Sequence, residues 1–520
     1  MRSLTLAPYL NLAIPRRRLY LALAFVTAVL LAAPSARAAS TFYIRGGGDG
    51  HGIGMSQYGA YGYALHGAGY QAILGHYYQG TALGTTDSNQ TVRVLISTGP
   101  AAFSGASAAG GTRLSSTQTY TVKPLATGRV AIIAATGKRV GPTFAPPLAV
   151  SGSAPLTVPG QGTYRGQLQF RPDGQGGVQT VDAVGLDDYV RGVVAEEMPA
   201  SWAAQALQAQ AVAARTYAIT TTVSGSGYDL YSDTRSQMYG GVGAETPATD
   251  AAVQATRGQI VTYHGQPAVT YFFASSGGYT EDVQNAWPGS SPEPWLRGVP
   301  DPYDGAGGDP YHQWGKQLSL SAAAGQLGSL LKGTLIGIKV TRHGISPRII
   351  QAEVAGTRGT TTVSGGQLQQ AFGLLATDAA FTTITTNATA TRLSGRVFPA
   401  RSGATYLVQA RRPTGWRTIA RGRLSATGSY THAIPRPGTY RVELGSLVGP
   451  SVTAVPARAA RLRAAARVQL AALLRLQRGA GPALPTGRLA RYAWPVTGHR
   501  RPLRPVPLVL RAARLDHRRR

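Results

Sequence analysis

The chain has 520 residues, with 66 glycines, 33 prolines and no cysteine, and its formal net charge is +29. This length allows about two to four domains with a sizeable core, and a hydrophobic content of 43% excludes the disordered class. The absence of cysteine excludes disulfides, thiolate zinc sites and a cysteine nucleophile. The many glycines and prolines indicate frequent turns and a β-rich body.

Residues 1–39 have the pattern of an export signal. A basic cluster, Arg16–Arg18, precedes the apolar run Leu19–Ala33, which at about 15 residues is short for a membrane span. Ala36-Arg37-Ala38 then fits a cleavage site. The alternative interpretation is an uncleaved membrane anchor. We expect a mature protein that is secreted or held in the cell wall.

The positive charge is concentrated at the two ends of the chain. Residues 1–39 contain five arginines and no acid, and residues 456–520 contain 16 arginines and one acid. The residues between them are moderately basic. Such a protein suits an anionic envelope with teichoic acids, phospholipid head groups and wall carboxylates. Because the chain lacks a recognisable nucleic-acid module, we expect no binding of nucleic acid.

The first part of the mature chain is predicted to be mostly β-structure after a helical segment. A short strand over Thr41–Arg45 leads into a flexible glycine-rich loop, and helical structure follows from about Ser56 to Gly80. Residues 90–180 alternate between apolar and polar positions between turn signals, which is typical of strands.

The next part is predicted to contain two helices. Residues 181–222 pass from a strand into one long helix that starts near Pro199 and Ser201. Helical spacing predicts one buried face, made of Trp202, Ala206, Leu207, Gln210, Ala211, Ala214 and Ala218. In the second helix Thr246 is the expected cap and Gly258 the expected end.

The C-terminal half is predicted to contain further strands. A hairpin across Gly265 leads into a Ser-Ser-Gly-Gly turn, and residues 315–385 read as a helix followed by strands. Residues 390–455 suggest a small separate β-sandwich. Residues 456–520 are expected to be a disordered Arg-rich tail, although residues 457–478 could instead form a basic amphipathic helix that lies on anionic surfaces.

Glu197 is the main candidate for acid–base chemistry. It follows Glu196 and precedes Met198-Pro199, where a loop is expected to become a helix. Cleavage of a glycosidic bond needs a proton on the leaving oxygen, and a carboxylic acid can supply it. A helix N-terminus would lower the pKa of this acid, so burial against Met198, Trp202 or Tyr279 would have to raise it. The alternative is a helix-terminal charge without chemistry.

Four motifs resemble the stage II sporulation protein D / LytB amidase-enhancer family. They are LDDYVRGVVAEEMPASWAAQALQAQAVAARTYA (186–218), DTRSQMYGG (233–241), ATDAAVQATRGQIVTYHGQPAVTYFFASSGGYTED (248–282) and PWLRGVPDPYD (294–304). The resemblance covers roughly residues 90–385. It implies a peptidoglycan lytic transglycosylase in which Glu197 protonates the glycosidic oxygen after MurNAc. Glu197 then acts as base while the muramyl C6 hydroxyl closes a 1,6-anhydro ring. Family members prefer glycan strands that an amidase has stripped of stem peptides.

The chain departs from the family pattern in three places. Some members hold zinc through Cys and His near the DTRSQM motif, whereas Ser232, Arg235 and Ser236 stand here, so we expect no metal and no cofactor. The segment GHGIGMSQYGA (50–60) precedes the domain instead of closing it. We therefore expect residues 40–81 to fold back against the catalytic body. A second acid, Glu196, could raise the pKa of Glu197 by repulsion.

Several residues are predicted to bind the glycan. His51 in the glycine-rich loop could bind sugar hydroxyls or orient Glu197; alternatively it is an exposed turn residue, or it binds a metal with His66 or His76. The alternative role of Arg215 is a structural ion pair. A serine of the Ser-Ser-Gly-Gly turn could instead be a nucleophile, but the G-x-S-x-G motif that usually surrounds such a serine is absent, so substrate positioning is favoured. The full predicted substrate-binding set is His51, Ser56, Gln57, Arg215, Gln237, Tyr239, Ser275, Ser276, Gly277, Tyr279 and Trp287.

The expected fold is α+β. A β-rich catalytic domain over residues 40–385, with a few helices around a cleft, is followed by the small β-sandwich. Within the catalytic domain, residues 40–81 are the displaced segment, 90–180 the β-rich part and 181–385 the core. The expected partners are peptidoglycan glycan strands and a cell-wall amidase, and the basic tail could contact anionic polymers or membrane surfaces. The rival hypothesis is a non-catalytic glycan-binding protein that enhances an amidase, and a third is a two-carboxylate hydrolase.

Overall fold

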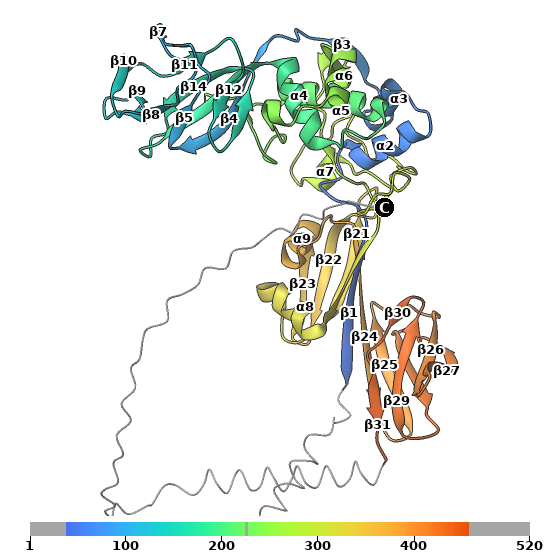
Figure 1. The fold of residues 1–520 in the computed structure, drawn as a ribbon. Helices are drawn as coiled ribbons and strands as arrows, with labels where there is room; N and C mark the ends of the chain where they lie inside the picture. Colours follow the sequence, from blue (N-terminus) through green and yellow to red (C-terminus); the bar gives the residue numbers. More distant parts are fainter. Residues whose placement is uncertain (1–37, 224–226, 457–520) are drawn as a thin grey trace, which may run out of the picture. The chain divides into compact units, whose positions relative to one another are not determined.

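The computed structural model describes residues 38–223 and 227–456, which all lie within one compact unit. The predictions for the export signal and the Arg-rich tail fall outside these residues. The described part is β-rich with a few helices, so the predicted α+β class is confirmed (Figure 1). In these residues no helix is long and apolar enough to cross a membrane.

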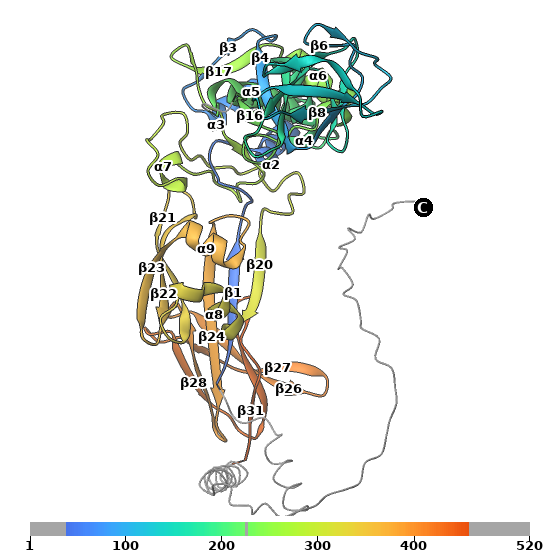
Figure 2. The same ribbon diagram turned by 90° about the vertical axis from the view of Figure 1, so that its left-hand side faces the viewer.

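The first strand, β1 (Ala39–Gly46), pairs with strands that come much later in the chain. Its antiparallel neighbours are β20 (Trp314–Ser319) and β24 (Ala379–Ala388), and both figures show it lying along β24 (Figures 1 and 2). Phe42 and Ile44 of β1 are fully buried in a core that they share with apolar residues between Ala323 and Phe381. The glycine-rich loop that follows β1 is thereby anchored at its N-terminal side.

The helical segment predicted over Ser56–Gly80 is two helices, α2 (Gln57–Leu65) and α3 (Tyr70–Tyr77). Ser56 caps α2 by accepting the N–H of Gly59. The preceding strand, β2 (Met55–Ser56), pairs in parallel with β19 (Phe272–Phe273). The displaced segment therefore packs into the body of the protein.

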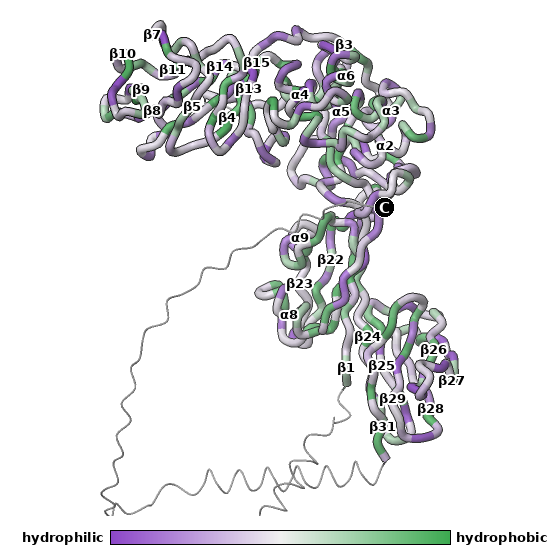
Figure 3. The backbone as a smooth tube through the Cα atoms, in the orientation of Figure 1, coloured by the Kyte–Doolittle hydropathy of each residue, from purple (hydrophilic) through white to green (hydrophobic). Residues whose placement is uncertain are grey.

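The segment between residues 90 and 185 is made of strands, as predicted. Two larger sheets have the orders β10-β9-β8-β5 and β16-β4-β15-β14-β11-β6-β7, and β12 pairs with β13. Figure 3 shows apolar and polar residues interspersed along these strands, in keeping with their mixed burial. The bounds are β4 (Thr91–Gly99), β5 (Ala101–Phe103), β6 (Ala108–Ala109), β7 (Thr112–Arg113), β8 (Tyr120–Pro124), β9 (Val130–Ala134), β10 (Arg139–Phe144), β11 (Leu148–Ser151), β12 (Leu156–Val158), β13 (Gly162–Tyr164), β14 (Gln167–Pro172) and β15 (Val178–Gly185).

Two helices occupy this part of the chain: the predicted long helix begins at Ala204 rather than near Pro199, and a helix that was not predicted precedes it. The first, α4 (Leu186–Glu197), ends at Met198, whose backbone is extended (φ −131°, ψ 139°). A residue before proline is driven out of the helical region by the proline ring, so Pro199 stops a helix here. The second, α5 (Ala204–Thr220), is buried around most of its circumference, and its alanines allow close packing.

The helix predicted after Thr246 is confirmed as α6 (Pro247–Ala255), with Thr246 and Thr249 forming a capping box. The hairpin across Gly265 is short: β17 (Gln259–Tyr263) pairs with β18 (Gln266–Pro267) on one side and β3 (Ala82–Thr85) on the other. Beyond β18 the chain leaves this sheet and reaches β19. Smaller elements in this part are β16 (Leu230–Tyr231), η1 (Gly241–Gly243) and α7 (Val283–Ala286).

The remaining elements form two further packed regions with separate apolar cores. The first contains α8 (Leu320–Leu327), η2 (Gly328–Leu330), β21 (Leu335–His343), β22 (Ile349–Gly356), β23 (Gly359–Ser364) and α9 (Gly365–Phe372). The second contains β25 (Arg392–Phe398), β26 (Thr405–Arg412), β27 (Gly415–Arg423), β28 (Ser429–Ala433), β29 (Gly438–Leu444), β30 (Leu447–Val448) and β31 (Val452–Ala454). One sheet, β20-β1-β24-β25-β28, is continuous across the boundary that was expected near residue 390.

Candidate active site

Glu197 is the last residue of α4, not a residue at the start of a helix. This position of Glu197 reverses the expected effect of the helix dipole. The C-terminal end of a helix carries partial negative charge, which disfavours a carboxylate and favours its protonated form. The helix therefore acts in the same direction as burial, and the conflict expected from the sequence does not arise.

Burial raises the pKa of Glu197, and it is the largest influence on this group. Two hydrogen bonds oppose it: Oε1 accepts from the backbone N–H of Met238 (2.9 Å) and Oε2 from the side-chain amide of Gln57 (3.1 Å). The charge of Glu196 adds a smaller upward shift to the pKa of Glu197. Glu196 itself is exposed, so the two neighbouring acids have different environments. Glu197 is thus fixed in place and biased toward the protonated form.

A cavity of about 480 Å³ opens beside Glu197. Its walls come from several parts of the chain: residues 49–51, the start of α2, the end of α4, Tyr217 of α5, the 234–238 loop and the β19 region with Trp287. The aromatic rings and hydroxyl groups in this wall can stack on sugar rings and hydrogen-bond with them. The lining residues are Asp49, Gly50, His51, Gln57, Glu197, Tyr217, Thr234, Arg235, Ser236, Met238, Tyr271, Phe272, Phe273, Ala274 and Trp287.

His51 is held in this wall as a neutral imidazole. Burial, together with the nearby charge of Arg348, lowers the pKa of His51 to about 3. Its Nδ1 accepts the N–H of Ile53 (3.0 Å), and its ring packs on Phe273 and Trp287 with centroid distances of 5.3 and 5.1 Å. The alternative of an exposed turn histidine is therefore wrong.

His66 and His76, the alternative metal partners of His51, have other contacts. His66 stacks on Tyr303, and His76 bonds to the Tyr63 hydroxyl and the Pro300 carbonyl. Within the described ranges, the one group of acids and histidines close enough to share an ion is Asp304, Asp309 and His312.

The Ser-Ser-Gly-Gly turn wraps around Asp304, a buried acid that the sequence reasoning missed. Asp304 accepts hydrogen bonds from the hydroxyls of Ser56 (2.8 Å) and Ser275 (3.1 Å) and from the backbone N–H groups of Ser276 (2.9 Å) and Gly277 (3.0 Å). Burial alone would raise the pKa of Asp304, but these bonds and one from His312 outweigh it and lower the pKa.

This network corrects the role predicted for part of the binding set. Ser56, Ser275 and Ser276 are buried, and their polar groups are used inside the protein. They join α2 to the turn rather than facing a glycan. They place Gln57, the residue next to Ser56, against Glu197.

Three other predicted binding residues are also buried and internally bonded. Arg215 is fully buried and donates from Nε to Asp187 (2.5 Å), which supports the alternative of a structural ion pair. Gln237 donates to the Tyr189 hydroxyl (3.1 Å) and Tyr239 to the Asp182 carboxylate (2.8 Å). We assign these three residues to the packing beneath the cavity, since none of them lines it.

The last two predicted residues lie in different places. Trp287 is half-buried, lines the cavity and contacts Tyr271 edge-on at a centroid distance of 4.7 Å. Tyr279 instead forms a backbone bridge with Pro300 and does not line the cavity. Met198, Trp202 and Tyr279 are likewise absent from the wall around Glu197, and Trp202 stacks on Tyr61.

Sequence reasoning missed several residues of the cavity wall. Tyr217 lies two residues after Arg215 on α5, and burial raises its pKa to about 12, so its hydroxyl stays protonated. Arg235 pairs with Asp233 and lies over the Tyr231 ring. Asp49 stands two residues before His51, and burial raises the pKa of Asp49 as well. Tyr217 and Arg235 lie inside the quoted motifs, which was the available signal, and Asp49 directly precedes the 50–60 segment.

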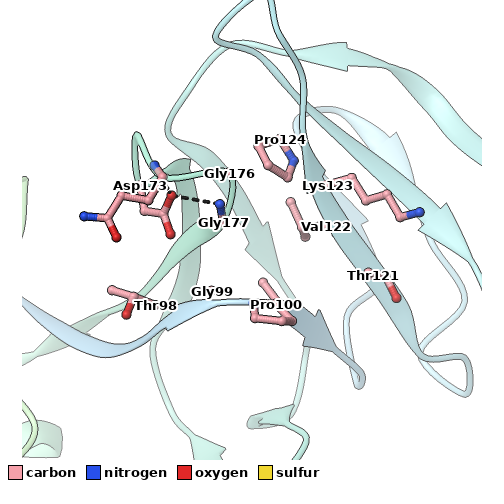
Figure 4. Close-up of a pocket in the computed structure, with 12 residues that line it drawn as sticks. Thr98, Gly99, Pro100, Thr121, Val122, Lys123, Pro124, Asp173, Gly176 and Gly177 are labelled. Carbon is pink, nitrogen blue, oxygen red and sulfur yellow. Dashed lines mark hydrogen bonds between the residues drawn. The ribbon is translucent and has the colours of Figure 1, made fainter.

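A larger cavity, of about 720 Å³, lies in the β-rich segment and shares no residue with the Glu197 cavity. Figure 4 shows its wall, with Pro100, Lys123 and Asp173 drawn as sticks. Asp173 accepts the N–H groups of Gln175 (2.7 Å) and Gly177 (2.8 Å), so its carboxylate serves the turn. Asp173 is the one acid among the residues that line this cavity, and acid–base chemistry is better placed at Glu197, whose pKa burial raises.

Comparison with known proteins places the site in a family. A family model described as "Stage II sporulation protein" matches residues 174–263, which include α4, Glu197 and α5. The chain is 34% identical over 218 residues to stage II sporulation protein D of Bacillus subtilis, covering 38% of this chain and 61% of that protein. It is 41% identical over 115 residues to the amidase enhancer of the same organism, covering 22% and 15%. It is 35% identical over 142 residues to stage II sporulation protein D of Bacillus amyloliquefaciens, covering 24% and 41%.

The chain thus spans less than two thirds of the length of each of these relatives. The residues that the family model matches nevertheless contain α4, α5 and Glu197. Over residues 174–263 the chain matches the stage II sporulation protein family, and it is similar to stage II sporulation protein D and to the amidase enhancer.

Proposed function

We propose that the protein is a peptidoglycan lytic transglycosylase that cleaves MurNAc–GlcNAc linkages, with Glu197 as general acid and then general base. In this proposal residues 40–385 form the catalytic domain, and the protein acts outside the cytoplasm on the cell wall. The names of the relatives, a sporulation protein and an amidase enhancer, support a role connected with the cell wall.

The observation that carries the proposal is the environment of Glu197. A general acid must hold its proton until the leaving oxygen needs it, so its pKa should lie above the usual range. Burial raises the pKa of Glu197, and the acid lies at a helix C-terminus beside a cavity. The two hydrogen bonds from Met238 and Gln57 fix the direction of its carboxyl group.

The proposed reaction consumes no water. The Glu197 carboxyl group gives its proton to the oxygen between MurNAc C1 and GlcNAc C4, the C1–O bond breaks, and GlcNAc leaves with a free C4 hydroxyl. The C6 hydroxyl of the same MurNAc then attacks C1, and its proton passes to the Glu197 carboxylate. The acid is regenerated, and the product carries a 1,6-anhydro ring.

Mass analysis of the products from amidase-stripped glycan strands tests this proposal. Wild type should give 1,6-anhydro products, and Glu197→Gln should give none, because the amide cannot donate or accept the proton in this way. Glu196→Gln is the matched control: it removes the exposed neighbouring acid and should retain most of the activity. Absence of anhydro products with wild type would refute the transglycosylase.

The second candidate function is a non-catalytic protein that enhances an amidase, and the identity with the amidase enhancer favours it. The two functions differ in how they depend on Glu197. A non-catalytic enhancer should stimulate a cell-wall amidase equally well as wild type and as Glu197→Gln. Stimulation that disappears with Glu197→Gln would instead support glycan cleavage as the source of the effect.

A two-carboxylate hydrolase is also testable, because Asp49 lines the same cavity as Glu197. Such an enzyme needs a second acid as nucleophile or as base for water. It would release reducing-end sugars that are one water heavier than the anhydro products. If the protein is such a hydrolase, Asp49→Asn should abolish hydrolysis. If it is a transglycosylase, Asp49→Asn should still form the anhydro product.

A further inference from the structure

The C-terminal region, residues 390–456, carries the excess positive charge of the described chain. It contains ten arginines, no lysine and a single acid, Glu443. Residues 40–389, in contrast, contain twenty lysines and arginines and twenty acids, so their formal charges cancel. The basic character of the chain between its two arginine-rich ends therefore belongs to this region alone.

Four of these arginines lie on the same face of the sheet that contains β27, β26 and β29. Tyr406, Val408 and Ala410 of β26 are buried in the core of the region, so the positions that alternate with them point outward. Residues paired across neighbouring strands point to the same side as their partners. Figure 2 shows β26 and β27 as a hairpin at the side of this region. The register gives the outward arginines, which we call the arginine face: Arg411 of β26, Arg421 and Arg423 of β27, and Arg441 of β29.

Within the described residues, no ion pair neutralises the arginine face. The salt bridges that residues 38–223 and 227–456 contain are all formed between residues 93 and 312. Glu443 of β29 accepts the N–H of the Gln409 side chain (2.5 Å), and Arg441 donates to the carbonyl oxygen of the same side chain (2.7 Å). One carboxylate therefore faces four guanidinium groups, three of which are exposed.

Trp416 of β27 holds two of these arginines in position. The guanidinium carbon of Arg441 lies 4.2 Å from the centre of its ring, and that of Arg411 lies 5.6 Å away. Such a contact orients a guanidinium group while its N–H donors remain available at its edge. Because the half-buried ring is already in contact with two cations, it is poorly suited to stack on a sugar. The face presents hydrogen-bond donors and positive charge.

A soluble polyanion fits this face better than a membrane does. Among the described residues, no large apolar side chain of the C-terminal region is exposed. Binding to a membrane surface usually combines basic residues with apolar ones that enter the lipid layer. Charged residues also protect an edge strand such as β27 from pairing with other chains. Acidic residues would serve that purpose equally well, so protection alone does not explain the excess of arginine.

We infer that the arginine face binds a linear polyol phosphate polymer of the cell wall. Arg421 and Arg423 are two positions apart on one strand, which corresponds to about 7 Å, and a polymer of short polyol phosphates repeats its charge at a similar interval. A guanidinium group offers paired N–H donors to phosphate oxygens. This binding is separate from the proposed reaction at Glu197, because it would hold the protein on the wall whichever chemistry occurs there.

Binding of fluorescently labelled poly(glycerol phosphate) to the full-length protein, at about 0.15 M ionic strength, tests this inference. Two triple variants remove the same charge and leave the arginines of residues 456–520 unchanged, so any binding by those arginines is equal in both. The face variant carries Arg411→Gln, Arg421→Gln and Arg423→Gln. The matched control replaces three exposed arginines of β25 and of the turn before β29, and it carries Arg392→Gln, Arg396→Gln and Arg436→Gln.

We expect the face variant to bind the polymer at least about tenfold more weakly than wild type, and the control to stay within about threefold. The affinity of the face variant should also depend less steeply on salt concentration, because fewer counterions are released. The melting temperatures of both variants verify that they are folded. A loss in the face variant no larger than in the control, or no binding by wild type, would overturn the inference.

Vesicles that contain phosphatidylglycerol form the membrane arm of the experiment. Weaker binding of the face variant to vesicles, with unchanged binding to the polymer, would overturn the polymer as the partner. Failure of the transglycosylase appears differently: wild type would form no anhydro product from soluble stripped glycan, while the difference between the face variant and the control on poly(glycerol phosphate) would remain.

Discussion

The side chain of Gln57 donates a hydrogen bond of 3.1 Å to Glu197, and the two residues are 140 positions apart in the sequence. Gln57 is the first residue of α2, and Glu197 is the last residue of α4. The displaced N-terminal segment thus reaches the proposed catalytic acid directly. It contributes Asp49, Gly50, His51 and Gln57 to the same cavity.

Replacement of Gln57 should change the pH dependence of the reaction. The Gln57 amide bonds to the carboxylate and holds the pKa of Glu197 lower than burial alone would. In Gln57→Leu the pKa of Glu197 should rise, so the limb of the profile that requires protonated Glu197 should move to higher pH. We also expect about a tenfold loss of kcat/KM from the less well-placed carboxyl group.

The pH profile of kcat/KM on amidase-stripped glycan measures this effect. Gln57→Glu is a useful companion, because a second acid in contact with Glu197 should raise the pKa of the pair even more. A profile of Gln57→Leu that is identical in shape to wild type would show that the bond does not influence the titration of Glu197.

The raised pKa of Glu197 also predicts an effect on stability. An acid whose pKa is higher in the folded than in the unfolded state binds its proton more tightly when folded. Stability is therefore lost as pH rises from the ordinary value of 4.5 through the raised pKa. Glu197→Gln removes this ionisation, and the Gln57 amide can rotate to present its oxygen to the new side chain.

Thermal melting across pH is the measurement. Glu197→Gln should melt about 1–4 °C higher than wild type at pH 8, and the difference should shrink toward pH 4, where Glu197 is protonated in both states. Glu196→Gln, at the exposed neighbouring position, should show a much smaller pH-dependent difference. A lower melting temperature for Glu197→Gln at pH 8 would contradict the burial argument.

Asp304 should be essential for the shape of the site although it does not line the Glu197 cavity. It receives bonds from Ser56, Ser275, Ser276, Gly277 and His312. In Asp304→Asn one oxygen becomes an N–H₂ group that faces these donors, so we expect a loss of about 2–4 kcal/mol in the free energy of unfolding. Activity should fall as well, because Ser56 precedes Gln57 in the chain.

Denaturant unfolding followed by an activity assay checks this prediction. Asp87→Asn is the control, since Asp87 is exposed and accepts only a local backbone N–H within its turn. We expect the control to change the unfolding free energy by less than about 0.5 kcal/mol. Equal effects of the two substitutions would show that the network around Asp304 contributes little.

The local sequence was sufficient to predict those helices and strands whose own residues mark where they begin and end. Thr246 and Pro247 marked the start of α6, and the alternating residues of 90–180 marked strands. The role of Pro199 was predicted wrongly, because a proline can either open a helix or end the preceding one. The structure shows that α4 ends just before Pro199.

The polar contacts of the site could not be predicted from spacing. Ser56 and Asp304 are 248 positions apart, and the bond between them forms only when β2 pairs with β19 and the turn closes. Motif resemblance identified Glu197, His51 and Gln57 as site residues. It could not separate them from Arg215, Gln237 and Tyr239, because the family pattern contains cavity residues and the buried residues that support them.

Arg215 allows these two kinds of residue to be distinguished by experiment. It is fully buried, pairs with Asp187 and donates to the carbonyls of Ala211 and Gln259. Arg215→Met leaves the Asp187 carboxylate without its partner, and we expect a loss of about 3–5 kcal/mol in the free energy of unfolding. The same loss in Asp187→Asn, and a double variant less destabilised than the sum, would be the signature of an ion pair.

A binding residue would behave differently from a structural one at this position. If Arg215 is structural, the folded fraction of Arg215→Lys should have a KM on stripped glycan within about twofold of the wild-type value. The activity lost at assay temperature should return on cooling, as the folded fraction recovers. A large rise in KM in fully folded Arg215→Lys would instead assign Arg215 to substrate binding, as the sequence pattern first suggested.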